Sequence, residues 1–137
     1  MYHAIYIEYA ARDYPLAKII LESNPDTPII FVRHYKDVFN RPHQNQLWQK
    51  NHPFLVLAIK EPPFLYEGPE ICQNFGNAFF YYTSFLLNCP YDCKYCYLQG
   101  MYPSSGQVAF VNTDDFLSAI ATLAQSPKPE DAQMNAI

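Results

Sequence analysis

The apolar positions of the chain form short runs that predict strands and longer stretches with helical spacing. The strand-like runs lie at residues 4–9, 28–32, 54–59, 78–87 and 107–111. A first helix is expected from Asp13, with Pro15 in its first turn, to Asn24. A second is expected after Asn112, where Asp114 and Asp115 suit a helix start. Strands that alternate with helices in this way predict an α/β protein with a parallel sheet.

The connecting segments are polar or rich in proline. Residues 34–53 read as a loop with one helical turn near Trp48, and residues 63–76 as irregular chain. Core packing is the expectation for Trp48 and Phe54. The strongly aromatic run at 78–87 predicts a buried strand that leads into a cysteine segment. We therefore divide the chain into residues 1–76, an N-terminal α/β region, and residues 77–137.

Composition sets limits on the function. The chain has 137 residues, enough for one modest hydrophobic core, and half of them are apolar. No apolar run approaches the ~20 residues that cross a bilayer, and the N-terminus lacks the features of a signal peptide. A cytoplasmic protein without a membrane partner is expected. The net charge of −4, with nine scattered Lys and Arg residues, argues against a broad nucleic-acid-binding face within this stretch.

Three of the four cysteines lie within eight residues, in the run Cys89-Pro-Tyr-Asp-Cys93-Lys-Tyr-Cys96. In a cytoplasmic protein, this clustering indicates metal or redox chemistry rather than a disulfide framework. A zinc site with Cys72 as fourth ligand is one alternative, although zinc sites more often use paired Cys-x2-Cys units. For Cys72 itself, a place in the core is the expectation, in preference to a role as a ligand.

The Cys-x3-Cys-x2-Cys spacing favours an iron–sulfur cluster. Three thiolates leave one iron of a four-iron (4Fe-4S) cluster open, and that iron can chelate S-adenosyl-L-methionine. An electron from the cluster would then release a 5′-deoxyadenosyl radical. An aromatic residue before the third cysteine, here Tyr95, is usual in radical-SAM proteins. The candidate cluster and metal ligands are therefore Cys89, Cys93 and Cys96.

The segment from Cys89 to Gln99 resembles the cluster loop of the spore photoproduct lyase family. Similar stretches lie at Ile7-Glu8-Tyr9, at Tyr14 to Lys18 and at Val111 to Asp115. The resemblance implies a DNA-repair lyase that reverses a methylene-linked thymine dimer, with damaged DNA as partner and a flavodoxin or ferredoxin as electron donor. It also implies that residues 77–137 begin a (β/α) barrel carrying the cluster loop.

The resemblance further implies that Tyr95 and Tyr97 assist a hydrogen-atom transfer in catalysis, although aromatic packing would explain both equally well. The family uses a further cysteine downstream as hydrogen donor, and no cysteine follows Cys96. A complete barrel needs roughly 250 residues, so we expect an N-terminal portion of a family member, inactive or weakly active alone. A radical-SAM paralogue with a non-DNA substrate and a non-enzymatic zinc-binding module stay open as alternatives.

Overall fold

The computed structural model describes residues 2–73, 75–76, 79–91, 93–96 and 100–126. The chain forms two compact units that alternate along the sequence. The first combines residues 1–60 with residues 85–112, and the second combines residues 61–84 with residues 113–137. The predicted boundary at residue 76 stays a prediction.

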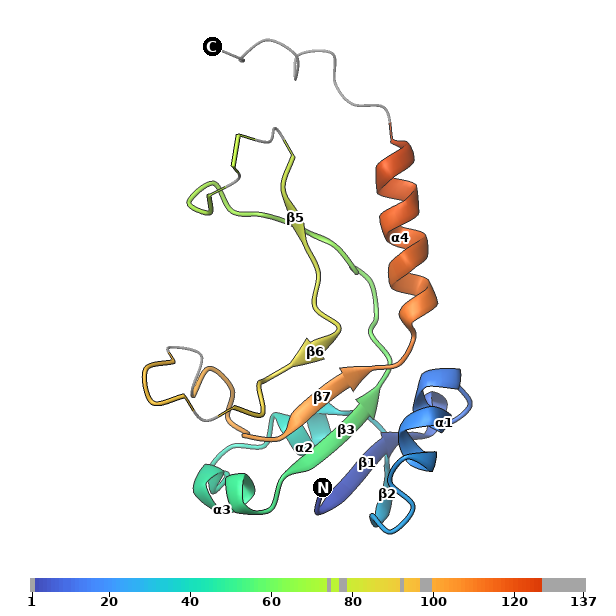
Figure 1. Cartoon of the computed structure of the whole chain (residues 1–137), viewed down its shortest axis with the longest axis vertical. Coiled ribbons are helices and arrows are strands. Elements are labelled where there is room, and N and C mark those ends of the chain that lie inside the picture. Colours follow the sequence, from blue (N-terminus) through green and yellow to red (C-terminus); the bar gives the residue numbers. More distant parts are fainter. Residues whose placement is uncertain (1, 74, 77–78, 92, 97–99, 127–137) are drawn as a thin grey trace. The chain divides into compact units, whose positions relative to one another are not determined.

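The first unit is built on a five-stranded sheet in the order β2-β1-β3-β7-β6 (Figure 1). Its strands are β1 (Ala4–Glu8), β2 (Ile29–Val32), β3 (Phe54–Ala58), β6 (Leu86–Leu87) and β7 (Gln107–Phe110). The first four in spatial order are parallel, and β6 pairs antiparallel with β7. The predicted α/β class with a mostly parallel sheet is confirmed.

One face of the sheet packs on the 3-10 helix η1 (Tyr9–Ala11) and on helix α1 (Pro15–Glu22). The register aligns Ile5 with Leu55 and Ile7 with Leu57, and these side chains form the core with Ala17 of α1. All five residues of β3 are buried, as expected for a central parallel strand covered on both faces.

The opposite face is covered largely by aromatic side chains. Helix α2 (Lys36–Phe39) buries Phe39, which leaves only 1% of its surface exposed. The ring of Tyr35 meets Phe110 edge to face, with centroids 5.6 Å apart. The rings of Phe39 and Tyr102 are also in contact, at 5.1 Å. This packing anchors residue 102, which lies just before β7.

Two buried polar side chains join the carboxyl ends of the parallel strands. The Glu8 carboxylate accepts hydrogen bonds from the backbone N–H groups of Tyr35 (2.7 Å) and Ile59 (2.9 Å). The Asn112 amide bonds both backbone groups of Lys60, accepting at 2.9 Å and donating at 3.0 Å. These bonds satisfy strand-end groups that the sheet ladder leaves open.

The second unit contains a small antiparallel pair, β4 (Tyr66–Glu67) with β5 (Tyr81–Tyr82), and helix α4 (Thr113–Gln125). The rings of Tyr66 and Tyr82 stack across the pair. Helix α4 buries Phe116, whose ring contacts Phe64, and it carries the predicted acidic residues in its first turn.

The structure corrects several local predictions. Within the described part of the run 78–87, two separate two-residue strands replace the single buried strand, because the chain changes from one unit to the other inside this run. Leu86 is 61% exposed, and β6 runs antiparallel to its neighbour. Helix α1 has Tyr14 rather than Asp13 at its N-cap. Trp48 and Cys72 are exposed, whereas Phe54 is buried as predicted.

No helix in the described ranges is both long and apolar enough to cross a bilayer. The cytoplasmic location stays a prediction.

Candidate cysteine-loop site

The cysteine segment leaves the sheet after β6 and returns to it at β7. Because these two strands are antiparallel, the carboxyl end of β6 lies beside the amino end of β7. The loop therefore begins and ends at the amino-terminal edge of the parallel strands. Sites in parallel folds usually lie at the opposite, carboxyl-terminal edge. The antiparallel pairing of β6 accounts for the difference.

Asn88 fixes the outgoing limb of the loop, which is the segment that follows β6. It adopts a left-handed backbone conformation, with φ of 69°, which Asn tolerates better than most residues. Its side-chain amide donates hydrogen bonds to the carbonyls of Ser104 (2.8 Å) and Gly106 (2.9 Å) on the returning limb. One side chain thus ties the two limbs together directly beside Cys89.

The side chain of Gln49 fixes the returning limb, which is the segment that leads into β7. Its side-chain oxygen accepts hydrogen bonds from the Ser105 backbone N–H (2.9 Å) and from the Ser104 hydroxyl (3.3 Å). The Ser105 hydroxyl donates to the carbonyl of Gln46 (3.1 Å), and the Gln46 side chain donates to the carbonyl of Tyr102 (3.0 Å). The polar face of one short helix therefore holds the segment that closes the loop.

That helix, α3 (Gln46–Asn51), has Asn45 as its N-cap. The Asn45 side-chain oxygen accepts a hydrogen bond from the backbone N–H of Trp48 (2.9 Å), which satisfies one of the open donors of the first turn. A cap of this kind is visible in the sequence. The role of Gln46 and Gln49 in holding residues 102–106 cannot be read from the sequence, because the residues that they bond lie more than 50 positions away.

The three candidate ligands lie on this loop, and none of them forms a disulfide. Cys89 is exposed, and Cys93 and Cys96 are partly buried. A turn brings the last two together, with the Cys96 backbone N–H donating to the carbonyl of Cys93 (3.0 Å). Cys72 is an exposed free thiol in the second unit, so the expectation of a core thiol is wrong.

The two candidate tyrosines have different outcomes. Tyr95 is 92% exposed, so the alternative of aromatic packing does not hold for it. Tyr97 lies outside the described residues. Tyr91, which the sequence did not single out, is 76% exposed on the same loop.

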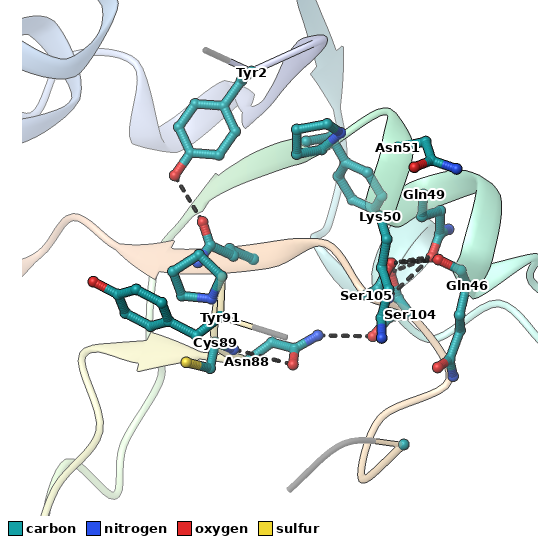
Figure 2. A pocket seen from close by; sticks show the side chains of 15 residues that line it. Tyr2, Gln46, Gln49, Lys50, Asn51, Asn88, Cys89, Tyr91, Ser104 and Ser105 are labelled. Carbon is teal, nitrogen blue, oxygen red and sulfur yellow. Dashed lines mark hydrogen bonds between the residues drawn. The ribbon is translucent and has the colours of Figure 1, made fainter. Parts of the chain in front are cut away.

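A pocket of about 840 Å³ lies where the loop meets the sheet edge. Figure 2 shows Cys89 and Tyr91 on one side of it, and the side chains of Gln46, Gln49 and Lys50 on another. The Tyr2 hydroxyl donates to the side-chain oxygen of Gln107 (2.7 Å) at its border. Partial burial raises the pKa of Tyr2, because removal from water disfavours the phenolate.

The donor set of the loop suits a soft metal centre, since thiolates are the preferred ligands of iron–sulfur clusters. None of the three thiols is used in a disulfide, and both limbs of the loop are tied at its base. Within the described ranges, however, no three Cys, His, Asp or Glu side chains are gathered closely enough to hold a metal ion. The residues therefore fit a cluster by their chemistry, while iron–sulfur binding stays a prediction.

The fold and the site together define the class: an α/β protein with a mostly parallel sheet and a three-cysteine loop projecting from one edge. The same fold occurs in solved structures of spore photoproduct lyase. One structure, complexed with dinucleoside spore photoproduct, matches with a TM-score of 0.69 and 21% sequence identity. The match covers 95% of this chain and 38% of that chain.

Two mutants of the same enzyme match with similar coverage. A tyrosine-to-phenylalanine mutant gives a TM-score of 0.70 at 20% identity. A double mutant with bound AdoMet and dinucleoside spore photoproduct gives 0.64 at 21% identity. Each match covers 95% of this chain and 38% of the other. The predicted resemblance is thus confirmed for the fold, and the chain spans little more than a third of the length of these structures.

No protein-family model matches the chain, and no curated protein matches it.

Proposed function

We propose that the chain carries the radical-initiating part of a radical-SAM lyase similar to spore photoproduct lyase. One combined observation supports this proposal: a Cys-x3-Cys-x2-Cys loop stands on a fold shared with structures of that enzyme. The fold alone would not specify the chemistry. The cysteine spacing alone would not specify the kind of radical-SAM enzyme.

In this proposal, Cys89, Cys93 and Cys96 are the thiolate ligands of a 4Fe-4S cluster. Such a cluster, when bound, supplies the electron that cleaves S-adenosyl-L-methionine to a 5′-deoxyadenosyl radical. The chain positions the ligands: Asn88 and the α3 glutamines fix both limbs of the loop. The exposed Tyr95 has a phenolic O–H that can give up a hydrogen atom, and we propose the same role for Tyr97 by resemblance.

The proposed substrate is ultraviolet-damaged DNA that carries the thymine-dimer spore photoproduct. Similar structures contain the dinucleoside form of this lesion. Because this chain shares their fold, they support the lesion as the proposed substrate. The proposed partners are this damaged DNA and a reduced flavodoxin or ferredoxin. The net charge of −4 leads us to expect weak DNA binding by this chain alone.

Anaerobic reconstitution with iron and sulfide tests the cluster. We expect about four irons per chain and a brown species that absorbs at ~410 nm. Cys93→Ser should lose this absorption, because it removes one of three ligands. Cys72→Ser is the matched control, since Cys72 is a free thiol outside the loop, and it should load iron like the parent.

Two results would refute the cluster. One is a parent protein that stays colourless after reconstitution while remaining folded. The other is stoichiometric zinc that is lost in Cys72→Ser as well as in Cys93→Ser, which would favour the zinc-binding module.

The substrate is tested separately on the loaded protein. With dithionite and S-adenosyl-L-methionine, chromatography should detect slow release of 5′-deoxyadenosine from the parent and none from Cys93→Ser. Addition of dinucleoside spore photoproduct should increase this release, with little conversion to thymidine products by this chain alone. Release that the lesion does not change would favour a paralogue with another substrate.

A further inference from the structure

The outer strand of the sheet, β2, exposes apolar side chains on both faces. Ile29, Ile30 and Phe31 are 46%, 41% and 42% exposed, although side chains of consecutive strand residues point to opposite faces. Tyr9 is 65% exposed and stacks on Phe31, with ring centroids 5.3 Å apart, so it extends the apolar surface. An edge strand of this kind is a ready template for pairing with another strand.

The backbone groups at the outer edge follow from the pairing with β1. The carbonyl of Pro28 accepts a hydrogen bond from the Ile5 backbone N–H (2.9 Å) and therefore faces β1. Because backbone direction alternates along a strand, the N–H and C=O groups of Ile29 and Phe31 face outward. Neighbouring strands in the described sheet lie only on the β1 side of β2. Two residues thus offer donors and acceptors to an added strand.

The strand lacks the features that usually protect an edge. Ile29–Val32 contains no charged residue and no proline. Opposite charges flank it instead: Asp26 lies before the strand and Arg33 directly after it, and both are exposed. An antiparallel neighbour of the same sequence would bring unlike charges together at each end. A parallel one would bring like charges together.

We propose that two copies of this chain pair through β2 as a two-fold symmetric, antiparallel dimer. A two-fold axis at Ile30 places Ile29 of each copy opposite Phe31 of the other, so the outward backbone groups meet as hydrogen-bonded pairs. Arg33 of each copy then lies at the same end as Asp26 of the other. The pairing joins the two sheets into one and covers the apolar edge.

Sedimentation over a concentration series tests the association. A single chain has a mass of 15.9 kDa, and we expect the weight-average mass to rise to twice this value and to level off there. A mass that stays at 15.9 kDa up to about 0.5 mM overturns the proposal, since that excludes all but very weak pairing. Growth beyond the dimer without a plateau overturns it as well.

Two variants address the edge directly. Phe31→Pro removes an outward N–H that the pairing needs, and proline is tolerated where a strand N–H faces solvent. Ile30→Lys places two like charges opposite each other at the axis. Each should raise the dissociation constant by about tenfold or more. The matched control is Leu117→Lys, which changes an exposed leucine on α4 and should leave the dimer unchanged.

Charge reversal tests whether the two copies of β2 pair antiparallel. Asp26 and Arg33 are exposed, so their replacement leaves the hydrophobic core unchanged. Arg33→Glu should weaken the dimer, because it places two acidic residues at each end. The double variant Asp26→Lys with Arg33→Glu should restore it. Circular dichroism confirms that each variant is folded. A folded Ile30→Lys variant that still dimerises like the parent refutes pairing through β2, and a double variant weaker than Arg33→Glu alone refutes the antiparallel arrangement.

Discussion

Asn88 offers a decisive test of how the cysteine loop is held, because it combines two separable properties. Its backbone is left-handed, with φ of 69°, and its side chain bonds two carbonyls across the loop base. Asn88→Gly keeps the backbone conformation available and removes both cross-loop hydrogen bonds, together with the exposed bond that the side-chain oxygen accepts from the Cys89 backbone N–H (3.1 Å). Asn88→Ala removes the hydrogen bonds and also places a β-carbon in the left-handed region.

The expected losses follow from these two terms. Each of the two part-buried cross-loop hydrogen bonds contributes about 0.5–1.5 kcal/mol, so Asn88→Gly should lower the free energy of unfolding by about 1–3 kcal/mol. A left-handed conformation costs an alanine about 1–2 kcal/mol, whereas glycine adopts it freely. Asn88→Ala should therefore be less stable than Asn88→Gly by about 1 kcal/mol or more.

Urea unfolding followed by fluorescence measures these differences. Trp48 is the one tryptophan of the chain and lies on α3, so its emission reports on the unit that holds the loop. Asn40→Ala is the control, since Asn40 is exposed with φ of −96°, and its effect should stay within about 0.5 kcal/mol. If Asn88→Gly unfolds like the parent, the cross-loop bonds do not stabilise the fold. If the alanine and glycine variants are equal, the backbone conformation is not a constraint.

Three further substitutions have defined outcomes. Gly106→Ala should destabilise the chain by about 1–3 kcal/mol in urea unfolding, because the new methyl group overlaps the buried ring of Phe54; an unchanged midpoint would contradict this contact. Glu8→Gln should cost about 2–3 kcal/mol in the same assay, because an NH2 group then faces one of two backbone N–H donors; Glu8→Gln as stable as the parent would show that the carboxylate is not needed. Because the pKa of Tyr2 is raised in the folded chain, its phenol ionises first in the unfolded chain. The neutral phenol therefore adds its full stabilisation to the folded state well below pH 10.0, and this stabilisation is lost as the pH rises through the folded-state pKa. The stability advantage of the parent over Tyr2→Phe should therefore be constant at neutral pH and shrink above about pH 10; an advantage that persists there would refute the assignment.

The sheet could be predicted from the sequence because its central strands are governed by local pattern. The runs at 4–9 and 54–59 are nearly continuous in apolar residues, which is typical of strands covered on both faces. The helix after Asn112 was likewise visible from its spacing and its first-turn acids. The cysteine spacing pointed to the loop, and the fold comparison agrees with the resemblance.

The base of the site could not be predicted, because its contacts connect residues distant in sequence. Nothing local indicates that Gln49 bonds Ser105 or that Asn88 bonds Gly106. The aromatic run before the cysteines was misjudged for a related reason. Its composition favours a buried strand, but its residues are divided between two units, and composition does not reveal where a chain crosses between units.

Binding of the proposed cluster should be coupled to the order of the loop. Hydrogen bonds fix the loop at its base, where Asn88 meets Gly106, whereas the described thiols farther along are not gathered into a ligand set. Gathering them costs conformational entropy, which metal–thiolate bonds must offset. Loosening the base adds to this cost without removing a ligand. Asn88→Ala should therefore raise the iron concentration needed for loading while leaving the final stoichiometry unchanged, whereas Cys93→Ser should lower the stoichiometry at every concentration.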